Sequence, residues 1–408
     1  MLRKFTHSAL ITSLLLLAAG AATPAPQEAK EKAPKDQAEY ELINKAFKEA
    51  DPAKKLPLLL DWEKKYPESD YKIDRVRLVM GSYQGTNQGA KAVETAKSLL
   101  KLVPGDFAAN YTITSLTPFL QQTPTPAVLS DGETAAKALV GGAIATQFDK
   151  AKKPATVSDA QWNSARAQTE VSAHQTLGWI SMQRKDNTGA ETEFMRVLKL
   201  NPANAQVSYW LGNVVLAQGD PNKNELALFS FARAAAHEGE GALSPAGRKQ
   251  VDEYLNKVYM KYAGTVDDLP ALKATAKNQA LPPADLVIKS GAVRTFEKDQ
   301  KHRAENPNLY KYIDLREALK GADGDATWGK LKGLLTPKMA LYVVGSDSAR
   351  PSVLNLSSEP DGAVEVVLNL ENRLRAAPGK GRKVMIDGVA TALTKSPFKL
   401  TLNDGHTF

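Results

Sequence analysis

Side chains that could carry out chemistry are few and scattered in this chain of 408 residues. It contains no cysteine, which excludes disulfides, zinc–thiolate sites and thiol nucleophiles. After residue 22 the histidines are His174, His237, His302 and His406. None has a second histidine at the spacing with which a helix presents two ligands to a metal ion. We therefore expect neither a metal nor another cofactor.

Two short motifs are similar to those of enzymes. Residues 324–330 read GDATWGK and fit G-x-x-x-x-G-K, in which backbone amides cradle a phosphate. The next residue is Leu331, where such a site needs a hydroxyl for Mg²⁺, and no apolar strand precedes the motif. Residues 98–101 fit S-x-x-K but lie within a helical segment, where the serine is not presented to a substrate. We interpret both as coincidence, so the sequence predicts no catalytic residue and no enzyme.

The composition is that of an ordinary globular protein. Hydrophobic residues make up 43% and charged residues 24% of the chain, and 53 basic residues against 45 acidic ones give a formal charge of +8. These values argue against wholesale disorder and against a polytopic membrane protein. The length allows two or three domains, each with its own core.

The N-terminus has the features of a secretory signal. Residues 1–22 begin with two basic side chains, continue with an apolar run over 9–19 and end in small residues. That run is short for a membrane span of about 20 residues, so we expect cleavage and no integral span afterwards. Cleavage removes Arg3 and Lys4 and no acidic residue, so the charge falls from +8 to +6. We predict a bacterial protein exported to the periplasm or outside the cell, with a disordered linker over 23–37.

The middle of the chain repeats with a period of 34 residues. The pair Leu177-Gly178 returns 34 positions later as Leu211-Gly212, and a 34-residue period is typical of helix–turn–helix repeats. The best copies are residues 171–204 and 205–238. Their signature residues are Leu177, Gly178, Ala190, Phe194 and Pro202 in the first copy, and Leu211, Gly212, Ala227 and Phe231 in the second.

The spacing of these residues has a physical reason. Gly178 and Ala190 are small where two helices of one unit approach closely, and Phe194 fills the space between them. Pro202 stops the second helix because it lacks an N–H donor. On these residues, 38–268 resembles a tetratricopeptide-repeat (TPR) protein of the bacterial secreted type. The resemblance implies an α-solenoid of helix pairs that binds a protein or peptide partner in the cell envelope.

The resemblance also implies where a partner binds. In such solenoids the first helix of each pair lines the concave face. The residues that this places on the face are Gln175, Trp179, Met182, Tyr209, Asn213 and Leu216. An alternative for the apolar members is packing between helices, because apolar residues on helices usually belong to the core.

The C-terminal part changes character. Residues 269–325 are charged and compatible with helix, and we interpret them as a helical connector. Residues 326–408 contain five short apolar or alternating runs separated by turn residues. These predicted strands are 339–344, 352–356, 364–370, 383–390 and 398–402. They favour a small five-stranded β-barrel that resembles the OB type, and an SH3-like or sandwich module stays open.

Basic residues gather between two of the predicted strands. They are Arg373, Arg375, Lys380, Arg382 and Lys383. OB-type barrels often bind single-stranded nucleic acid through a basic groove and aromatic platforms, but aromatic residues are few here, which favours a solvated face. The sequence therefore predicts a mainly α protein, a solenoid followed by a barrel, that acts as an exported, non-catalytic interaction scaffold. Polyanion or single-stranded nucleic-acid binding by the barrel is the alternative.

Overall fold

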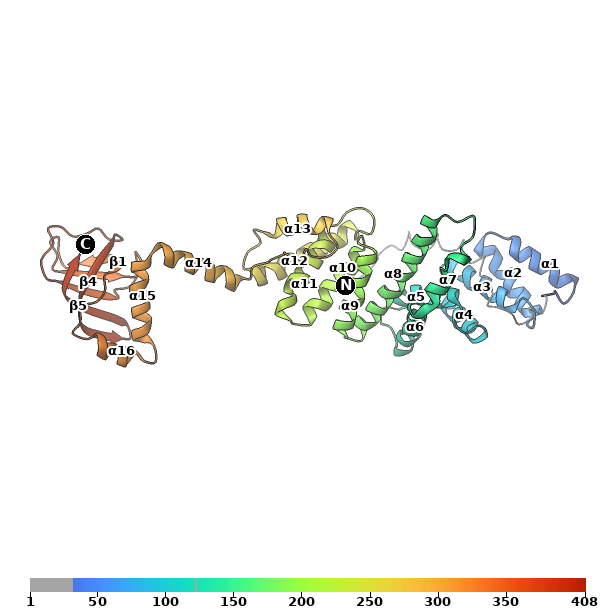
Figure 1. Ribbon diagram of the computed structural model, residues 1–408, viewed down its shortest axis with the longest axis horizontal. Coiled ribbons are helices and arrows are strands. Elements are labelled where there is room, and N and C mark those ends of the chain that lie inside the picture. The colour runs from blue at the N-terminus through green and yellow to red at the C-terminus, as the bar shows by residue number, and fades with distance from the viewer. Residues whose placement is uncertain (1–31, 122) are drawn as a thin grey trace. The chain divides into compact units, whose positions relative to one another are not determined.

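The computed structural model describes residues 32–121 and 123–408 (Figure 1). The predicted signal peptide, and the predicted linker up to residue 31, lie outside the described residues. Residue 32 is held in place, because the Tyr71 hydroxyl donates a hydrogen bond to the Lys32 carbonyl at 3.1 Å. The chain divides into two compact units between Ile288 and Lys289. The division falls within the segment 269–325 that we expect to be a connector.

The first unit is a stack of helices joined by short turns (Figure 1). Successive helices pack on each other from α1 to α6 and from α8 to α12, and α11 also contacts α13. The helices are α1 (Gln37–Lys48), α2 (Pro52–Lys65), α3 (Lys72–Gly85), α4 (Gly89–Leu102), α5 (Phe107–Leu120), α6 (Pro126–Ala138), α7 (Ile144–Gln147), α8 (Asp159–Gln183), α9 (Asn187–Leu200), α10 (Ala205–Ala217), α11 (Asn224–Ala236), α12 (Pro245–Ala263) and α13 (Leu269–Asn278).

The two best sequence repeats form the helix pairs α8–α9 and α10–α11. A Cβ atom on Gly178 would lie 2.6 Å from the Phe194 ring, and one on Gly212 would lie 2.8 Å from the Phe231 ring. Each glycine therefore lets the aromatic ring of the second helix lie directly on the first. Ala190, Phe194, Leu211, Ala227 and Phe231 are fully buried, Leu177 is half-buried and Pro202 is exposed.

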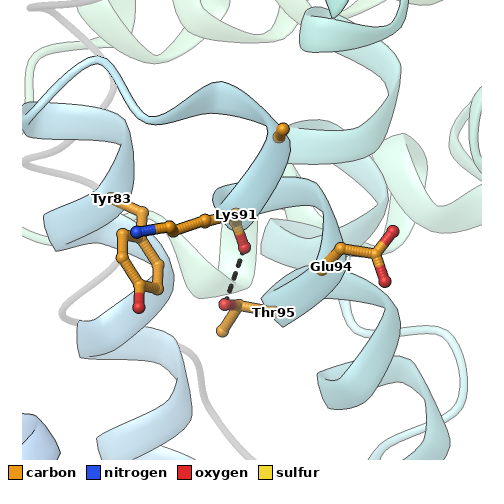
Figure 2. Close-up of a pocket in the computed structure, with 5 residues that line it drawn as sticks. Tyr83, Lys91, Glu94 and Thr95 are labelled. Carbon is orange, nitrogen blue, oxygen red and sulfur yellow. Dashed lines mark hydrogen bonds between the residues drawn. The ribbon is translucent and has the colours of Figure 1, made fainter.

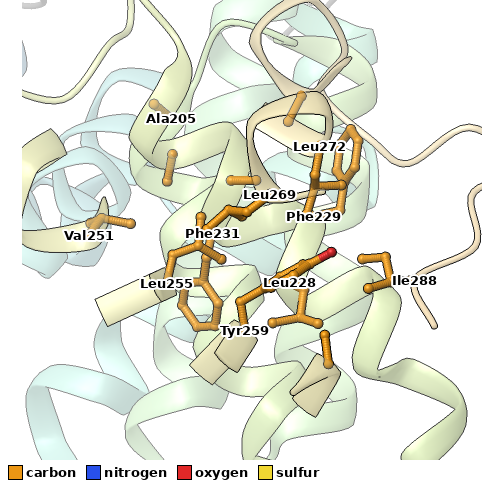
Figure 3. Close-up of a cluster of buried hydrophobic side chains, with 14 of the residues drawn as sticks. Ala205, Leu228, Phe229, Phe231, Val251, Leu255, Tyr259, Leu269, Leu272 and Ile288 are labelled. Carbon is orange, nitrogen blue, oxygen red and sulfur yellow. The ribbon is translucent and has the colours of Figure 1, made fainter. Parts of the chain in front are cut away.

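One core cluster joins the helices at the C-terminal end of this unit (Figure 3). Phe231 of α11 lies in it with Leu255 and Tyr259 of α12 and with Leu272 of α13. The segment after α13 is held on the same helices, because the Ile288 backbone N–H donates to the Glu225 carboxylate at 2.8 Å. Helices α12 and α13 therefore continue the stack beyond the second sequence repeat.

The second unit contains three helices and five strands among its described residues. Their bounds are α14 (Gly291–Glu305), α15 (Pro307–Lys320), α16 (Gly324–Leu331), β1 (Met339–Ser346), β2 (Val353–Ser357), β3 (Val366–Leu370), β4 (Lys383–Lys395) and β5 (Phe398–Thr407). The strands close into a barrel in the order β1-β2-β3-β5-β4. The pair β3–β5 is parallel and the others are antiparallel. A stack of helix pairs followed by a closed five-stranded barrel confirms the predicted fold class.

The last two strands are longer than the sequence predicts. The expected ends were residues 390 and 402, but β4 continues to Lys395 and β5 to Thr407. Two register shifts, at Asp387/Val389 and at Ala390/Ala392, let the two strands stay paired after the apolar alternation stops. Tyr312 of α15 is fully buried with the barrel core, so this helix belongs to the barrel unit.

Candidate functional site

Side chains that could carry out chemistry do not gather into a catalytic or metal site in the part of the chain that the structure describes. No group of three or more His, Asp or Glu side chains there could hold a metal ion. Residues 324–330, which fit a phosphate-loop pattern, form helix α16 instead of a loop. The Ser98 hydroxyl donates to the Glu94 carbonyl at 3.1 Å within α4, and His174 Nδ1 lies 2.6 Å from the Glu193 carboxylate. These side chains have structural partners.

The six predicted partner-binding residues lie on α8 and α10, the two helices that both pack on α9. Trp179 is only 6% exposed and packs in a cluster with Leu129 and Ile180. It offers a partner almost no surface, so the packing alternative holds for this residue. Met182 and Leu216 are half-buried and pack against the same helical core. The apolar members of the set therefore contribute chiefly to stability.

The two predicted amides are positioned differently from the apolar residues. Gln175 accepts a hydrogen bond from the Asn204 amide at 3.0 Å, and Asn204 caps α10 by accepting from the Val207 N–H at 3.1 Å. Asn213 donates to the Tyr209 carbonyl at 2.8 Å. Within the described residues, the Gln175 amide N–H₂ group and the Asn213 side-chain oxygen have no hydrogen-bond partner. One donor group and one acceptor group thus stay available, each on a side chain that is already oriented.

A pair of tyrosines, one on α10 and one on α12, contacts Phe231 of the second repeat. Tyr209 of α10 lies edge-on to Phe231, with ring centroids 6.1 Å apart. Tyr254 of α12 contacts the same ring at 5.2 Å and is 39% exposed. Burial raises the pKa of Tyr254, and the neighbouring Tyr209 raises this pKa further. Tyr209 and Tyr254 therefore lie close to each other, and both rings contact Phe231.

Sequence reasoning missed Tyr254 because the predicted binding residues all came from the two best repeats, which end at residue 238. The available signal was an aromatic residue directly after two acidic ones, Asp252 and Glu253. We call Gln175, Tyr209, Asn213 and Tyr254 the tyrosine–amide face.

A shallow groove lies elsewhere in the first unit, between α2 and α4, and α3 contributes to its lining. One end, lined by α3 and α4, is a pocket of about 300 Å³ that includes Tyr83, Lys91 and Glu94 (Figure 2). The Lys91 ammonium lies 5.5 Å from the centre of the Tyr83 ring, and the Thr95 hydroxyl donates to the Lys91 carbonyl at 2.8 Å. The groove is open to solvent and holds no pair of groups arranged for acid–base chemistry.

All five residues of the predicted basic patch are exposed. Lys380 lies 3.4 Å from Asp361, and Lys383 donates to the Asn306 side chain at 2.7 Å. The Lys383 ammonium also covers the Tyr342 ring at 5.1 Å, and Phe398 packs against the barrel core. In the described part of the chain, these two rings therefore offer no open stacking platform beside the arginines Arg373, Arg375 and Arg382. This geometry does not favour single-stranded nucleic acid.

Comparison with known proteins finds only distant similarity to solved structures. No protein-family model and no curated protein matches the chain. A solved structure described as a MamA RS-1 ArsTM double mutant is similar at 14% identity and a TM-score of 0.34, over 54% of this chain and 97% of that one. The assembly chaperone of RpL4 (Acl4, residues 1–338) is similar at 13% identity and a TM-score of 0.39, over 66% of this chain and 99% of that one. At such values neither description says anything about the activity of this chain.

Proposed function

We propose that this protein is a non-catalytic scaffold that binds a protein segment on the tyrosine–amide face, after export to the bacterial cell envelope. The observation that carries the proposal is the pair Tyr209 and Tyr254, which pack edge-on against one buried ring, Phe231. Tyrosine is enriched among the residues that dominate protein–protein binding energies. A ring that is already held in place loses little conformational entropy when a partner covers it.

The side-chain amides of Asn213 and Gln175 support a polypeptide partner. A peptide backbone carries one N–H donor and one carbonyl acceptor for each residue. The Asn213 side-chain oxygen can accept from such an N–H, and the Gln175 amide can donate to such a carbonyl. Asn213 lies one helical turn after Tyr209, so the two side chains share one face of α10. A segment on this face would thus meet an aromatic surface and polar groups together.

Support for the envelope location comes from the sequence. Residues 1–22 have the charge, length and small-residue pattern of a signal that is cleaved.

No helix among the residues that the structure describes is long and apolar enough to cross a membrane. In a protein without cysteine, packing of the helix pairs would have to supply the stability that disulfides give many exported proteins.

Photo-crosslinking from the face tests this function. A benzophenone amino acid in place of Tyr254 should capture a defined protein in living cells, and the same probe in place of Tyr83, in the groove between α2 and α4, should not capture it. Asn213→Ala should reduce the yield from position 254 without changing the unfolding temperature. Capture of the same protein from both positions, or of none from position 254, would contradict the proposal.

A further inference from the structure

Two leucines stand out of the barrel unit in the turn between α16 and β1. Leu334 and Leu335 are each 58% exposed. The turn is fixed on β4 by backbone hydrogen bonds, because the Gly333 N–H donates to the Ala390 carbonyl at 2.8 Å and the Ala390 N–H donates to the Leu334 carbonyl at 3.0 Å. The leucines are therefore presented outward by a structured turn.

The residues just before this turn show that the segment is able to bury apolar side chains. Trp328 and Leu331 of α16 pack against the barrel core. Only the next two large apolar residues, Leu334 and Leu335, are left in water. Covering these two leucines would remove apolar surface from water, which is favourable, and adjacent exposed apolar residues often mark an interaction surface.

The charge in the sequence around the leucines has one sign. Lys330, Lys332 and Lys338 are exposed, and the sequence from residue 326 to 346 contains no Asp or Glu. Lys330 and Lys332 form no ion pair with any carboxylate in the described ranges 32–121 and 123–408. The Lys338 ammonium lies 3.4 Å from the centre of the Phe408 ring, and that ring is itself 61% exposed. The segment thus combines protruding apolar side chains with unneutralised cations.

We propose that residues 330–338, the leucine turn, dock the barrel unit on the surface of an anionic lipid bilayer. Leu334 and Leu335 enter the boundary between headgroups and acyl chains, and the lysines contact the anionic headgroups. Apolar residues bordered by basic ones are the pattern of peripheral membrane contact. Lysine is a flexible point charge, whereas arginine suits fixed bidentate pairs. The three lysines therefore fit a fluid lipid surface better than an ordered acidic protein face.

This inference is independent of the tyrosine–amide face on the first unit. It concerns another unit of the chain and another class of ligand. Together the two surfaces describe a protein that is attached to a membrane surface through its barrel and binds a polypeptide through its helical stack. Failure of either proposal leaves the other intact.

Vesicle flotation tests the leucine turn. The chain without residues 1–22, which keeps every described helix and strand, should float with vesicles of phosphatidylglycerol and phosphatidylcholine and not with phosphatidylcholine alone. Leu334→Ser with Leu335→Ser should abolish flotation. Each of Lys330→Gln and Lys332→Gln should weaken binding about fivefold, and this loss should shrink at high salt. Because all four side chains are exposed, the unfolding temperature should stay unchanged.

A matched control comes from α14. Phe296 is 63% exposed but lies beside both Glu297 and Lys298, so Phe296→Ser should leave flotation unchanged. The chain has no cysteine, and a single Leu335→Cys can therefore carry an environment-sensitive dye. Its emission should shift to the blue on anionic vesicles, whereas a dye on Phe296→Cys should not shift.

Three results would overturn the proposal. The first is that the chain does not float with anionic vesicles. The second is that the double serine variant floats as well as the parent, or that Phe296→Ser abolishes flotation equally. The third is that Leu334→Ser with Leu335→Ser dissociates an oligomer in the absence of lipid, which would identify a second copy of the chain as the occupant of the surface.

Discussion

The ring of Phe231 occupies the space that a side chain on residue 212 would need. A Cβ atom built on Gly212 would lie 2.8 Å from the ring carbon Cε1, and Phe231 is fully buried. The same ring supports Tyr209 and Tyr254 on the neighbouring helices. A single contact between two helices of one repeat therefore sets both the helix spacing and the position of the tyrosine–amide face.

Gly212→Ala should destabilise the first unit because the buried ring cannot move freely away from the new methyl group. Overpacking of this kind costs about 1–3 kcal/mol, which should appear as a lower midpoint in chemical denaturation. Gly329→Ala is the control, since no atom lies within 4 Å of its Cβ position on α16. That change should be neutral or stabilising by up to about 1 kcal/mol. An unchanged midpoint for Gly212→Ala would mean that the helices can separate at little cost.

Features that depend on local spacing could be predicted from the sequence. The small residue at 178 and the aromatic one at 194 predict a close helix pair, and alternating runs predict the strands. Features that depend on distant residues could not. Trp179 is buried because Leu129, fifty positions away, contributes to its cluster, and β5 extends beyond its apolar residues because β4 stays paired with it across two register shifts. The exposure of Tyr254 and of Leu334 likewise follows from tertiary packing.

Tyr254→Ala should weaken partner binding without unfolding the protein. The side chain is 39% exposed, so its loss opens no closed cavity, whereas truncation of an interface hot spot costs about 2 kcal/mol or more. We expect an affinity at least about thirtyfold lower, measured by titration calorimetry with the captured partner. Tyr254→Phe keeps the edge-on contact with Phe231 and should retain most of the affinity. Equal binding by the alanine variant would exclude this face.

Trp179→Ala should show the opposite pattern. The indole is 6% exposed in its cluster, and truncation of a buried aromatic residue costs about 3–5 kcal/mol. The unfolding midpoint should therefore fall by much more than for Tyr254→Ala. At temperatures where the variant is still folded, its affinity for the partner should remain close to that of the parent. A variant with normal stability and lost binding would restore Trp179 as a contact residue.

Export should depend on residues 1–22. In a bacterial host, the full chain should reach the periplasmic or extracellular fraction, and N-terminal sequencing should find a start close to residue 23. Deletion of residues 1–22 should leave the protein in the cytoplasm. Replacing Leu15 and Leu16 by arginine should block export as well, because a charged residue in the apolar run prevents its insertion. A full-length chain that keeps its first residue in the envelope fraction would indicate an uncleaved anchor.

Barrel stability should fall as the pH rises from about 6.5 through the folded-state pKa of His406. The Asp387 and Glu371 carboxylates raise the pKa of His406 above its ordinary 6.5, with His406 Nδ1 at 2.9 Å from Asp387 and Nε2 at 3.0 Å from Glu371. Because the folded-state pKa exceeds the unfolded one, the stabilisation is fully present below about pH 6.5 and is lost as the pH rises through the folded-state value.

The check is the unfolding midpoint of the barrel unit across this pH range, followed by near-UV circular dichroism. His406→Gln removes the titrating group but keeps a side chain that can donate to a carboxylate, so its midpoint should vary less with pH than that of the parent. Direct titration of the His406 ring by NMR should give a pKa above 6.5. A slope that survives His406→Gln would assign the pH dependence to another group, and a ring pKa at or below 6.5 would show that the two carboxylates do not hold the charged imidazole.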